Sequence, residues 1–568
     1  MSLFRTLFVW SAAAWLAACA APAARTPAAT YDLVLRGGTI YDGSGGTPHV
    51  GDLAIEGDRI AFVGRPGSVR AEREIDVRGL AVAPGFINML SWSTESLIED
   101  GRSQSEIRQG VTLEVMGEGW SMGPLNDEMK VLALSRQADI RYPIEWTSLG
   151  EYLAHLERRG IAPNVASFVG ATTVRIHELG ERDVDPTPAQ LDRMRALVRR
   201  AMDEGAMGVG SSLIYAPATF AETDELVALV TEAGRCGGMY ISHMRSEGDA
   251  ILASVDELIE IARRSGAPAE IYHLKLAGRQ NWHLFDEVVA RIERARAAGL
   301  RITADMYTYP AGATGLSASM PPWVQEGGQE AWVARLRDPA IRARVAAEMR
   351  APGRGWENLF YGAGPDQILL AQFRNPALRQ YVGRTLADVA RQRDRSPEDT
   401  AMDLVVEDDS RVGAIYFLMS EENVRRGIAL PWVSFGSDAA SIATEGVFLN
   451  SHSHPRAYGT FARLLGRYVR DERVIPLQEA IRRLTSLPAS NLGIGDRGAL
   501  RPGFFADLAI FDPATIADRA TFAAPHAYAV GMRHVFVNGV HVLADGEPTG
   551  VTPGRVVRGP GWRRCPAS

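Results

Sequence analysis

The middle of the chain alternates short apolar segments with longer segments whose apolar residues recur at helical spacing. Residues 188–204, 222–235 and 251–265 show this spacing, which is typical of helices that pack one face on a sheet. Strands that alternate with such helices indicate a parallel sheet. Eight units of this kind predict an α/β protein with a (β/α)8 barrel over residues 84–496. The expected strands are residues 85–90, 111–117, 165–170, 207–211, 238–242, 269–272, 300–304 and 432–436.

A different pattern lies on both sides of this barrel. Residues 31–83 form short segments of alternating apolar and polar positions, separated by glycine turns, as in DLVLRGGTIYDGSG. A second strand-rich piece follows the barrel over residues 497–550. Neither piece carries enough apolar surface for a domain of its own. We therefore expect them to combine into one small β-sandwich, with residues 551–568 as a C-terminal tail.

The connection between the last two barrel strands is too long for a plain loop. It extends from Tyr309 to Pro431 and contains several helical stretches. We predict that about residues 318–425 form an inserted lid over the mouth of the barrel.

Residues 1–30 are expected to be a targeting segment and a linker. Arg5 precedes an apolar run that is too short to span a membrane and that ends in LAAC at Cys19. This ending resembles a bacterial lipobox, in which the cysteine is acylated. The alternative is an ordinary secretory signal cleaved near residues 20–24. We expect a periplasmic protein and, because Ala20 rather than aspartate follows the cysteine, an outer-membrane lipoprotein that contacts the membrane only through its lipid.

Composition narrows the choice of partner. The 568 residues include 61 Lys and Arg against 68 Asp and Glu, a net charge of −7, and we find no basic stripe. This argues against nucleic acid as a partner and leaves a small-molecule substrate. Besides Cys19 the chain has Cys236, at a predicted helix end, and Cys565, in the tail. Nothing in the pattern requires these two to pair, and no disulfide framework is expected. The sequence does not indicate an oligomeric state.

Two histidines and an aspartate stand at the ends of predicted strands. His243 follows the fifth strand, His273 the sixth and Asp438 the eighth. In a parallel barrel the C-terminal ends of all strands meet at one rim. Imidazole is the commonest ligand of zinc-like ions, and a nearby carboxylate can accept a proton from activated water. One strand-end histidine alone is more often structural, but two on neighbouring strands with an aspartate favour a metal site.

A third ligand is needed, because catalytic zinc usually takes three protein groups and one water. The second strand ends in VMGEGW, where Glu118 is flanked by glycines. Glycine lets the backbone approach closely, so the Glu118 carboxylate can turn inward. The alternative is that Glu118 is a solvated loop residue.

Several longer motifs carry a family resemblance. In order along the chain they include APGFI, RQGVT, EGAMGVGSSLIYAP, SHMRSEGD, IYHLKLAG, SHSHPRAYGTFARLLGRYVR and LTSLPASNLGIGDRGALRPGFFADLAIFDP. From residue 31 to about 546, the chain resembles the D-aminoacylase (N-acyl-D-amino-acid deacylase) family of the amidohydrolase superfamily. The resemblance implies a metal-dependent hydrolase, with one Zn²⁺ ion as the simplest cofactor and another divalent metal as the alternative.

The resemblance also implies roles for the strand-end residues. In that family the tightly held metal is bound by histidines that match His243 and His273 and by a cysteine on the second strand, at the position of Glu118 here. The aspartate that matches Asp438 is the catalytic acid and base.

Further matches imply a substrate site. The residues that match Lys275 and Arg456 bind the carboxylate of the substrate in that family. A tyrosine and a small hydroxyl residue assist them. Tyr307 and Tyr309 are the candidates for the tyrosine, and Thr314 is the candidate for the hydroxyl residue.

The departures from the family cluster at the barrel rim. Where the family has Asp-x-His-x-His, residues 88–92 read NMLSW, so the second, weaker metal site should be absent. Where the family has Gly-His-Gly-Thr, Ala171 replaces the histidine. The pattern suggests a remodelled site in which Leu90 and Trp92 make the pocket more hydrophobic.

These features predict a metal-dependent amidohydrolase that cleaves the amide bond of N-acyl amino acids, the D-forms among them, or of similar small amides. One alternative is a dipeptidase-like or cyclic-amide hydrolase on the same scaffold. Another is a catalytically inactive, anchored binding protein, which the loss of the His-x-His pair supports and the retention of Asp438, Lys275 and Arg456 opposes.

Overall fold

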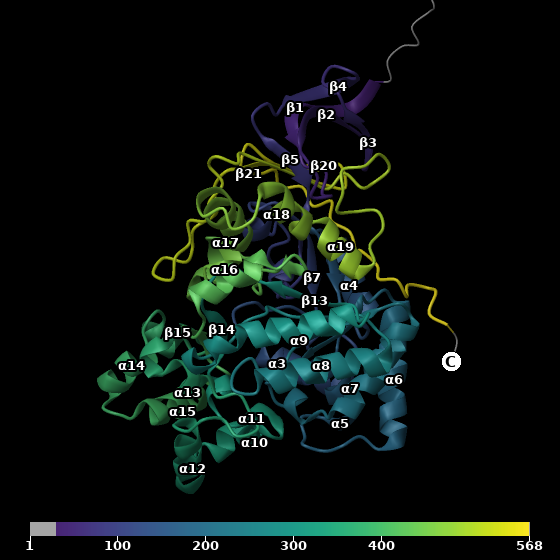
Figure 1. Ribbon diagram of the computed structural model, residues 1–568. Helices are drawn as coiled ribbons and strands as arrows, with labels where there is room; N and C mark the ends of the chain where they lie inside the picture. Colours follow the sequence, from purple (N-terminus) through teal and green to yellow (C-terminus); the bar gives the residue numbers. More distant parts are fainter. Residues whose placement is uncertain (1–29, 567–568) are drawn as a thin grey trace, which may run out of the picture.

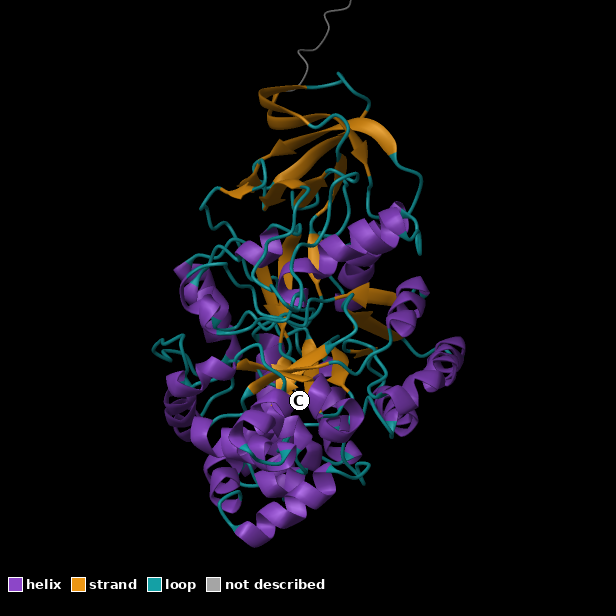
Figure 2. Ribbon diagram, turned by 90° about the vertical axis from the view of Figure 1, so that its left-hand side faces the viewer, coloured by secondary structure: helices purple, strands orange, loops and turns teal. Residues whose placement is uncertain are grey.

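The computed structural model describes residues 30–566, so the predicted targeting segment and Cys19 lie outside the described residues. The fold is mixed α/β. A strand-rich part made from both chain ends lies at the top of Figure 1, a body of strands and helices lies below it, and a helical insert projects to one side. Figure 2 shows the upper strands and the strands inside the body as separate groups. Within residues 30–566 we find no helix with the length and apolar content needed to cross a membrane.

All eight strands predicted for the body are present, the third of them divided into β8 and β9, and their outer boundaries differ from the prediction by at most two residues. They are parallel and form two ladders, one of β6, β7 and β8 and one of β9 to β13 with β17 at its edge. Their bounds are β6 Phe86–Asn88, β7 Val111–Met116, β8 Asn164–Ser167, β9 Val169–Gly170, β10 Gly208–Ser212, β11 Met239–His243, β12 Ala269–Ile271, β13 Ile302–Met306 and β17 Val433–Phe435.

The two ladders are hydrogen-bonded to each other at both edges. Strands β8 and β9 are separated only by Phe168, and at this edge the Met207 N–H, just before β10, donates to the Ser167 carbonyl of β8 at 2.9 Å. At the other edge the Met89 N–H donates to the Phe435 carbonyl at 3.2 Å. The apolar side chains inside, Leu90, Val115 and Tyr272 among them, form one buried cluster.

Helices cover the body. Helix α6 begins with a capping box, in which the Thr187 side chain accepts from the Gln190 N–H and the Gln190 side chain accepts from the Thr187 N–H in return. In α8 the residues that pack inward include Val255, Leu258 and Ile261, at the spacing predicted from the sequence. The helices are α1 Ser96–Glu99, α2 Gln104–Ile107, α3 Asp127–Arg136, α4 Leu149–Arg159, α5 Ala171–Leu179, α6 Pro188–Asp203, α7 Thr223–Arg235, α8 Ile251–Ser265, α9 Phe285–Ala297, α16 Glu421–Ala429, α17 Arg456–Arg463, α18 Leu477–Leu484 and α19 Ser486–Leu492.

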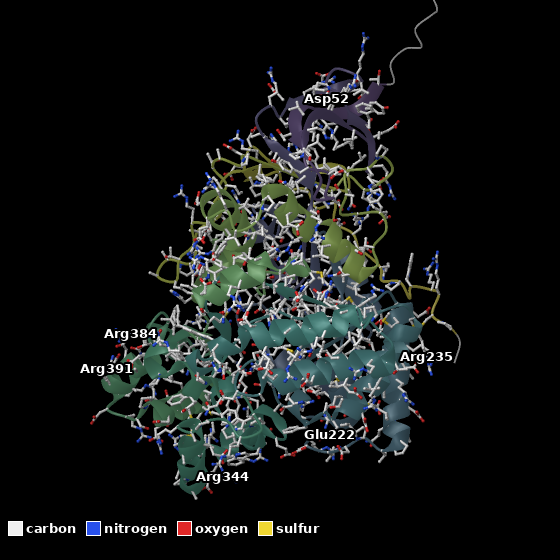
Figure 3. All side chains as sticks on the ribbon, viewed as in Figure 1. Asp52, Glu222, Arg235, Arg344, Arg384 and Arg391 are labelled. Carbon is white, nitrogen blue, oxygen red and sulfur yellow. A yellow bond between two sulfur atoms is a disulfide. The ribbon has the colours of Figure 1, made fainter. Side chains whose placement is uncertain are left out.

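The upper part is one nine-stranded sheet to which both chain ends contribute. The two pieces meet where β18 pairs antiparallel with β5. Asp52, labelled in Figure 3, is buried and accepts from Arg36 at 2.6 Å and from the Gly67 N–H at 2.7 Å. The strands are β1 Thr30–Ile40, β2 His49–Glu56, β3 Arg59–Gly64, β4 Arg70–Asp76, β5 Ala81–Pro84, β18 Leu508–Phe511, β19 Met532–Val537, β20 Val540–Ala544 and β21 Glu547–Pro548.

The long connection between β13 and β17 has a buried apolar core of its own. Its three strands form a small sheet in the order β14, β16, β15, and charged residues such as Arg344, Arg384 and Arg391 cover its outer surface (Figure 3). The elements are β14 Gly312–Gly315, α10 Pro322–Gln325, α11 Gly328–Arg335, α12 Pro339–Met349, α13 Leu359–Ala363, β15 Ile368–Gln372, α14 Leu386–Arg393, α15 Pro397–Asp408 and β16 Gly413–Tyr416.

The C-terminal tail crosses the body at the N-terminal ends of its strands. The Gly554 N–H donates to the Ile161 carbonyl at 2.8 Å, just before β8, and the Gly559 N–H donates to the Gly205 carbonyl at 2.9 Å, just before β10. Val557 joins the apolar cluster inside the ring of strands. The tail is therefore part of the folded body.

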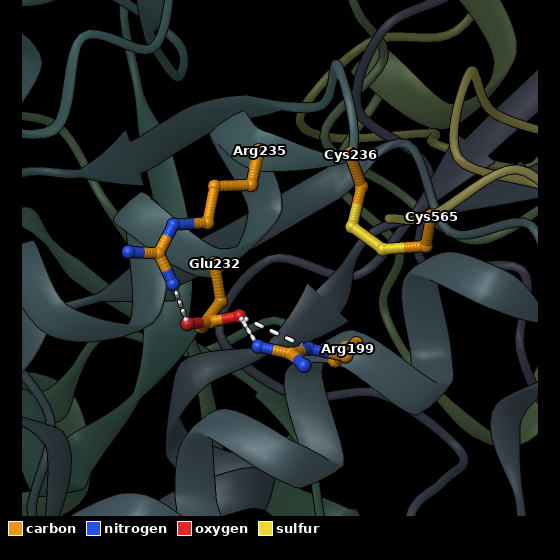
Figure 4. The surroundings of a disulfide bond; sticks show 5 residues. All are labelled: Arg199, Glu232, Arg235, Cys236 and Cys565. Atoms are coloured by element: carbon orange, nitrogen blue, oxygen red, sulfur yellow. Dashed lines mark hydrogen bonds and ion pairs between the residues drawn. A yellow bond between two sulfur atoms is a disulfide. The ribbon is translucent and has the colours of Figure 1, made fainter. Parts of the chain in front are cut away.

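The tail is also covalently attached, which corrects the expectation that Cys236 and Cys565 need not pair. The two form a disulfide between residues 329 positions apart, with their Cα atoms 4.7 Å from each other (Figure 4). Next to it, Glu232 accepts from Arg199 and Arg235. Sequence spacing could not reveal the bond, because only the path of the tail brings Cys565 to the end of α7.

We expect the paired change Cys236→Ser with Cys565→Ser to lower the free energy of unfolding by about 2–5 kcal/mol, because a disulfide restricts the unfolded chain. Chemical denaturation with and without a reductant measures this. Reductant should destabilise the wild type and leave the double variant unchanged. Equal stability of the wild type with and without reductant would contradict the prediction.

Candidate active site

Three predicted metal ligands converge from the C-terminal ends of three strands, of which β11 and β12 are neighbours and β7 is not. Glu118 follows β7 between Gly117 and Gly119, which both have positive φ. His243 is the last residue of β11, and His273 follows β12. Glu118 Oε1 lies 3.0 Å from His243 Nδ1 and 2.8 Å from His273 Nε2. All three side chains are buried, so the solvated-loop alternative for Glu118 is wrong.

This donor set fits a zinc-like ion. One ligand atom from each of the three residues lies within 4.8 Å of the other two. Tetrahedral zinc with bonds of about 2.0–2.1 Å holds its ligand atoms roughly 3.3 Å apart, close to the separations seen here. Two imidazoles and one carboxylate are also a donor set used by catalytic zinc, which leaves the fourth position for water. The three residues can therefore hold one ion.

The charges in the cluster support a metal-binding role. Burial opposes ionisation of the Glu118 carboxyl, but His273 and His243 more than offset this and hold its pKa well below the usual range. Burial and Lys275 lower the pKa of His273, yet the carboxylates of Glu247 and Glu118 raise it overall to about 10. A ligating imidazole must be neutral, so a cation bound here would displace the His273 proton, and Glu118 and Glu247 would then balance its charge.

Glu247 lies behind both histidines. Its Oε1 is 2.9 Å from His273 Nδ1, and its Oε2 is 3.7 Å from His243 Nε2. A carboxylate behind a ligating imidazole fixes the orientation of the ring and raises its basicity. Glu247 is four residues from His243 in the sequence, but its contact with His273 depends on the pairing of β11 with β12.

Lys275 is engaged within this network. Its Nζ is 2.8 Å from Glu247 Oε1, 2.6 Å from His273 Nδ1 and 3.2 Å from the His273 carbonyl. Glu247 and the His273 carbonyl accept from this ammonium group and use two of its three donors. Burial lowers the pKa of Lys275, but Glu247 raises it to about 12, so the side chain stays charged.

Asp438 faces the same cleft from the end of β17, with a φ of 50°. Trp92 Nε1 donates to Asp438 Oδ1 at 3.2 Å, and Arg456 Nη1 lies 2.6 Å from Asp438 Oδ2. Burial raises the pKa of Asp438 above its usual value, although Arg456 and His273 oppose this. The carboxyl group is thus suited to accept and return a proton.

The cleft has a volume of about 770 Å³ and lies between the strand ends and the insert. Every predicted site residue except Tyr309 lines it. Tyr309 instead donates through its hydroxyl to Asp518 at 2.9 Å, so Tyr307 is the tyrosine that the structure brings to the site. Thr314 lies on the insert, where its hydroxyl accepts from Arg411 at 3.1 Å.

Sequence reasoning missed two further residues of the cleft. Tyr215 lies edge-on to the imidazole of His243, with ring centres 5.3 Å apart. Arg411, from the insert, lies over the Tyr215 ring at 4.8 Å. Tyr215 lies in the motif EGAMGVGSSLIYAP, but the motif assigns it no role, and no motif marks Arg411. Their contact joins the fourth strand unit to the insert.

Glu357, also from the insert, gives a pH-dependent contribution to stability. It is buried, and its carboxylate accepts from the backbone of Glu247 and, at 3.2 Å, of Gly248. Burial raises its pKa to about 7, and the nearby charge of Glu247 adds to this. The folded protein therefore keeps a proton that the unfolded chain loses near its ordinary pKa of 4.5.

This group destabilises the fold as pH rises from about 4.5 to 7, because the unfolded state then binds fewer protons than the folded state. We expect the free energy of unfolding of Glu357→Gln to fall less steeply than that of the wild type as pH rises across this window. At pH 8 the variant should be more stable than the wild type by roughly 1–3 kcal/mol. Denaturation at a series of pH values measures it. Parallel profiles for variant and wild type would contradict the assignment.

Comparisons with known proteins agree with this geometry. A model of the amidohydrolase family matches residues 73–543. D-aminoacylase of Alcaligenes xylosoxydans xylosoxydans is 33% identical over 536 residues, which is 93% of this chain and 97% of the relative. N-acyl-D-glutamate deacylase of the same organism is 31% identical over 93% of this chain and 96% of the relative.

Solved structures show similarity to the same families. A crystal structure of D-aminoacylase is 33% identical, has a TM-score of 0.77 and covers 93% of this chain and 100% of that chain. N-acyl-D-glutamate deacylase from Bordetella bronchiseptica, solved with zinc and a phosphonate that mimics the tetrahedral intermediate, is 31% identical with the same TM-score and coverage. A D-hydantoinase structure, at 15% identity and a TM-score of 0.53 over 93% of this chain and 99% of that chain, shares the fold.

Proposed function

Because the chain belongs to the amidohydrolase family, we propose that it hydrolyses the amide bond of N-acyl amino acids, with the D-forms as first candidates. The observation that carries the proposal is one cleft shared by a three-residue metal site and Asp438. The relatives named for D-aminoacylase and N-acyl-D-glutamate deacylase activity support this substrate class. Zinc is the first candidate metal, since the Bordetella bronchiseptica structure contains it.

Glu118, His243 and His273 would hold the ion, and Glu247 orients the His273 imidazole from behind while its other oxygen lies 3.7 Å from His243 Nε2. A bound divalent ion supplies Lewis-acid chemistry, which polarises the amide carbonyl and makes water more acidic. Asp438 accepts the proton of the attacking water and delivers it to the leaving nitrogen as the C–N bond breaks.

The charged and polar groups around Asp438 would bind the substrate. Arg456 contacts Asp438 through Nη1, and its Nε has no hydrogen-bond partner among residues 30–566, so the guanidinium can also take the carboxylate of a substrate. Tyr307 lies beneath this guanidinium at 4.6 Å. Lys275 contributes its positive charge and holds Glu247, while Thr314 offers a hydroxyl from the insert.

The architecture that we assign is a (β/α)8 barrel over residues 84–496, a β-sandwich from residues 31–83 and 497–550, and a lid over about residues 318–425. The hydrogen bonds that join the two ladders at both edges support a closed barrel. The position of the insert beside the cleft supports a lid that excludes water during the reaction.

Export is part of the proposal. Disulfides persist mainly in oxidising compartments such as the periplasm, so the bond between Cys236 and Cys565 supports it. Anchoring through an acylated Cys19 follows from the LAAC sequence, and membrane contact would then be limited to the lipid.

The test is hydrolysis of paired N-acetyl-D- and N-acetyl-L-amino acids by zinc-loaded protein, with chelator-treated protein as the control. Turnover that disappears with the metal and returns with it supports the proposal. Hydrolysis of dipeptides or cyclic amides without turnover of either acyl series would favour the other hydrolase. A protein that binds no metal and cleaves none of these would be a binding protein.

A further inference from the structure

We propose that Trp92 positions Asp438 in place of a second metal ion, so that this protein works with one ion at any metal concentration. The inference rests on the proposed function for its catalytic part. Trp92 is a positioning residue here, because it acts on the substrate only through Asp438.

The backbone brings Trp92 to Asp438. The segment after β6 runs parallel to the segment after β17, with Ser91 paired to Ala439. The Asp438 N–H donates to the Leu90 carbonyl at 2.9 Å, and the Trp92 N–H donates to the Ala439 carbonyl at 3.0 Å. These two bonds fix Asp438 and Trp92 as neighbours across the rim although they lie 346 positions apart.

The side chains complete the arrangement. Trp92 Nε1 donates to Oδ1 of Asp438 at 3.2 Å, while Oδ2 lies 2.6 Å from Arg456 Nη1. A hydrogen bond on one oxygen and an ion pair on the other hold the carboxylate plane in one orientation. An indole N–H donates at every pH and cannot accept, so it favours the ionised carboxylate that the reaction needs. It also leaves one lone pair of each oxygen open to the cleft.

A second ion does not fit this rim. Position 90 is a leucine that is fully buried in the apolar cluster, and position 92 offers a donor where a cation requires an acceptor. Among residues 30–566, the only group of three or more His, Cys, Asp or Glu side chains that could share an ion is Glu118, His243 and His273. In D-aminoacylase, by contrast, a binuclear centre is described with activation by one metal and attenuation by the second.

The first experiment compares Trp92→Phe with the control Trp120→Phe. Trp120 lines the same cleft, but its indole makes no hydrogen bond to Asp438. Loss of a hydrogen bond to a charged group should lower kcat of Trp92→Phe by about tenfold or more, with KM changed less than twofold. The acid limb of its pH profile should move to higher pH, because Asp438 loses a donor that favours its charged form. Equal kcat and pH profiles in both variants would overturn the positioning role.

The second experiment counts bound zinc by elemental analysis after dialysis against excess zinc. The wild type should hold one ion per chain, and its rate should not fall as zinc is added in excess. Leu90→His combined with Trp92→His should raise the count toward two. Two ions in the wild type would overturn the inference. Because this count needs no substrate, it decides the inference even if no N-acyl amino acid is cleaved, a result that would defeat only the proposed function.

Discussion

Asp438→Asn should lower kcat by about 10²- to 10⁴-fold while one zinc ion stays bound, because general acid and base catalysis contributes this much and asparagine can do neither. The change keeps the size of the side chain and its contact with Trp92. Steady-state kinetics and a zinc count on the same sample measure the two effects separately.

Asp409→Asn is the matched control. This aspartate also lines the cleft, but it is exposed and lies 3.7 Å from Arg374 at the outer edge of the insert. We expect its kcat to stay within about twofold of the wild type, as for a surface substitution away from the reacting groups. A loss below tenfold in Asp438→Asn, or a loss of zinc from it, would show that Asp438 has another role.

The second large effect is expected at Glu118. Glu118→Gln should weaken zinc binding by about 10²-fold or more, because it removes the negative charge that faces both imidazoles at 2.8 and 3.0 Å. Activity at limiting zinc should fall in proportion. Glu118→Cys should retain zinc, since a thiolate is also a zinc ligand.

Zinc titrations followed by activity and by elemental analysis test this pair of variants. Glu95→Gln serves as the control, because Glu95 lines the cleft but bonds to Tyr142 instead of the histidines. Equal zinc affinity of Glu118→Gln and the wild type would remove Glu118 from the ligand set.

The strand ends could be predicted because parallel strands bring their C-terminal ends to one side regardless of the details of the loops. His243, His273 and Asp438 each follow an apolar strand, and the glycines around Glu118 marked a close approach of the backbone. Local patterns of this kind depend on residues near in sequence. These residues could therefore be predicted without knowledge of the fold.

The partners of these residues could not be predicted in the same way. Glu247 contacts His273 and Lys275 only because β11 and β12 are adjacent. The role of Tyr309 likewise depended on the register of the seventh strand unit, which turns its hydroxyl toward Asp518 and leaves Tyr307 at the cleft.

The sequence by itself determined the order of strands and helices, the ligand types and the absence of a His-x-His pair, since apolar periodicity and residue chemistry are local properties of the chain. The tertiary structure alone decided which distant groups meet. The indole of Trp92 reaches Asp438, and Cys565 reaches Cys236, because the path of the backbone brings together segments that are hundreds of residues apart. Contacts between residues so far apart produce no periodic pattern in a single sequence, so they cannot be predicted from it.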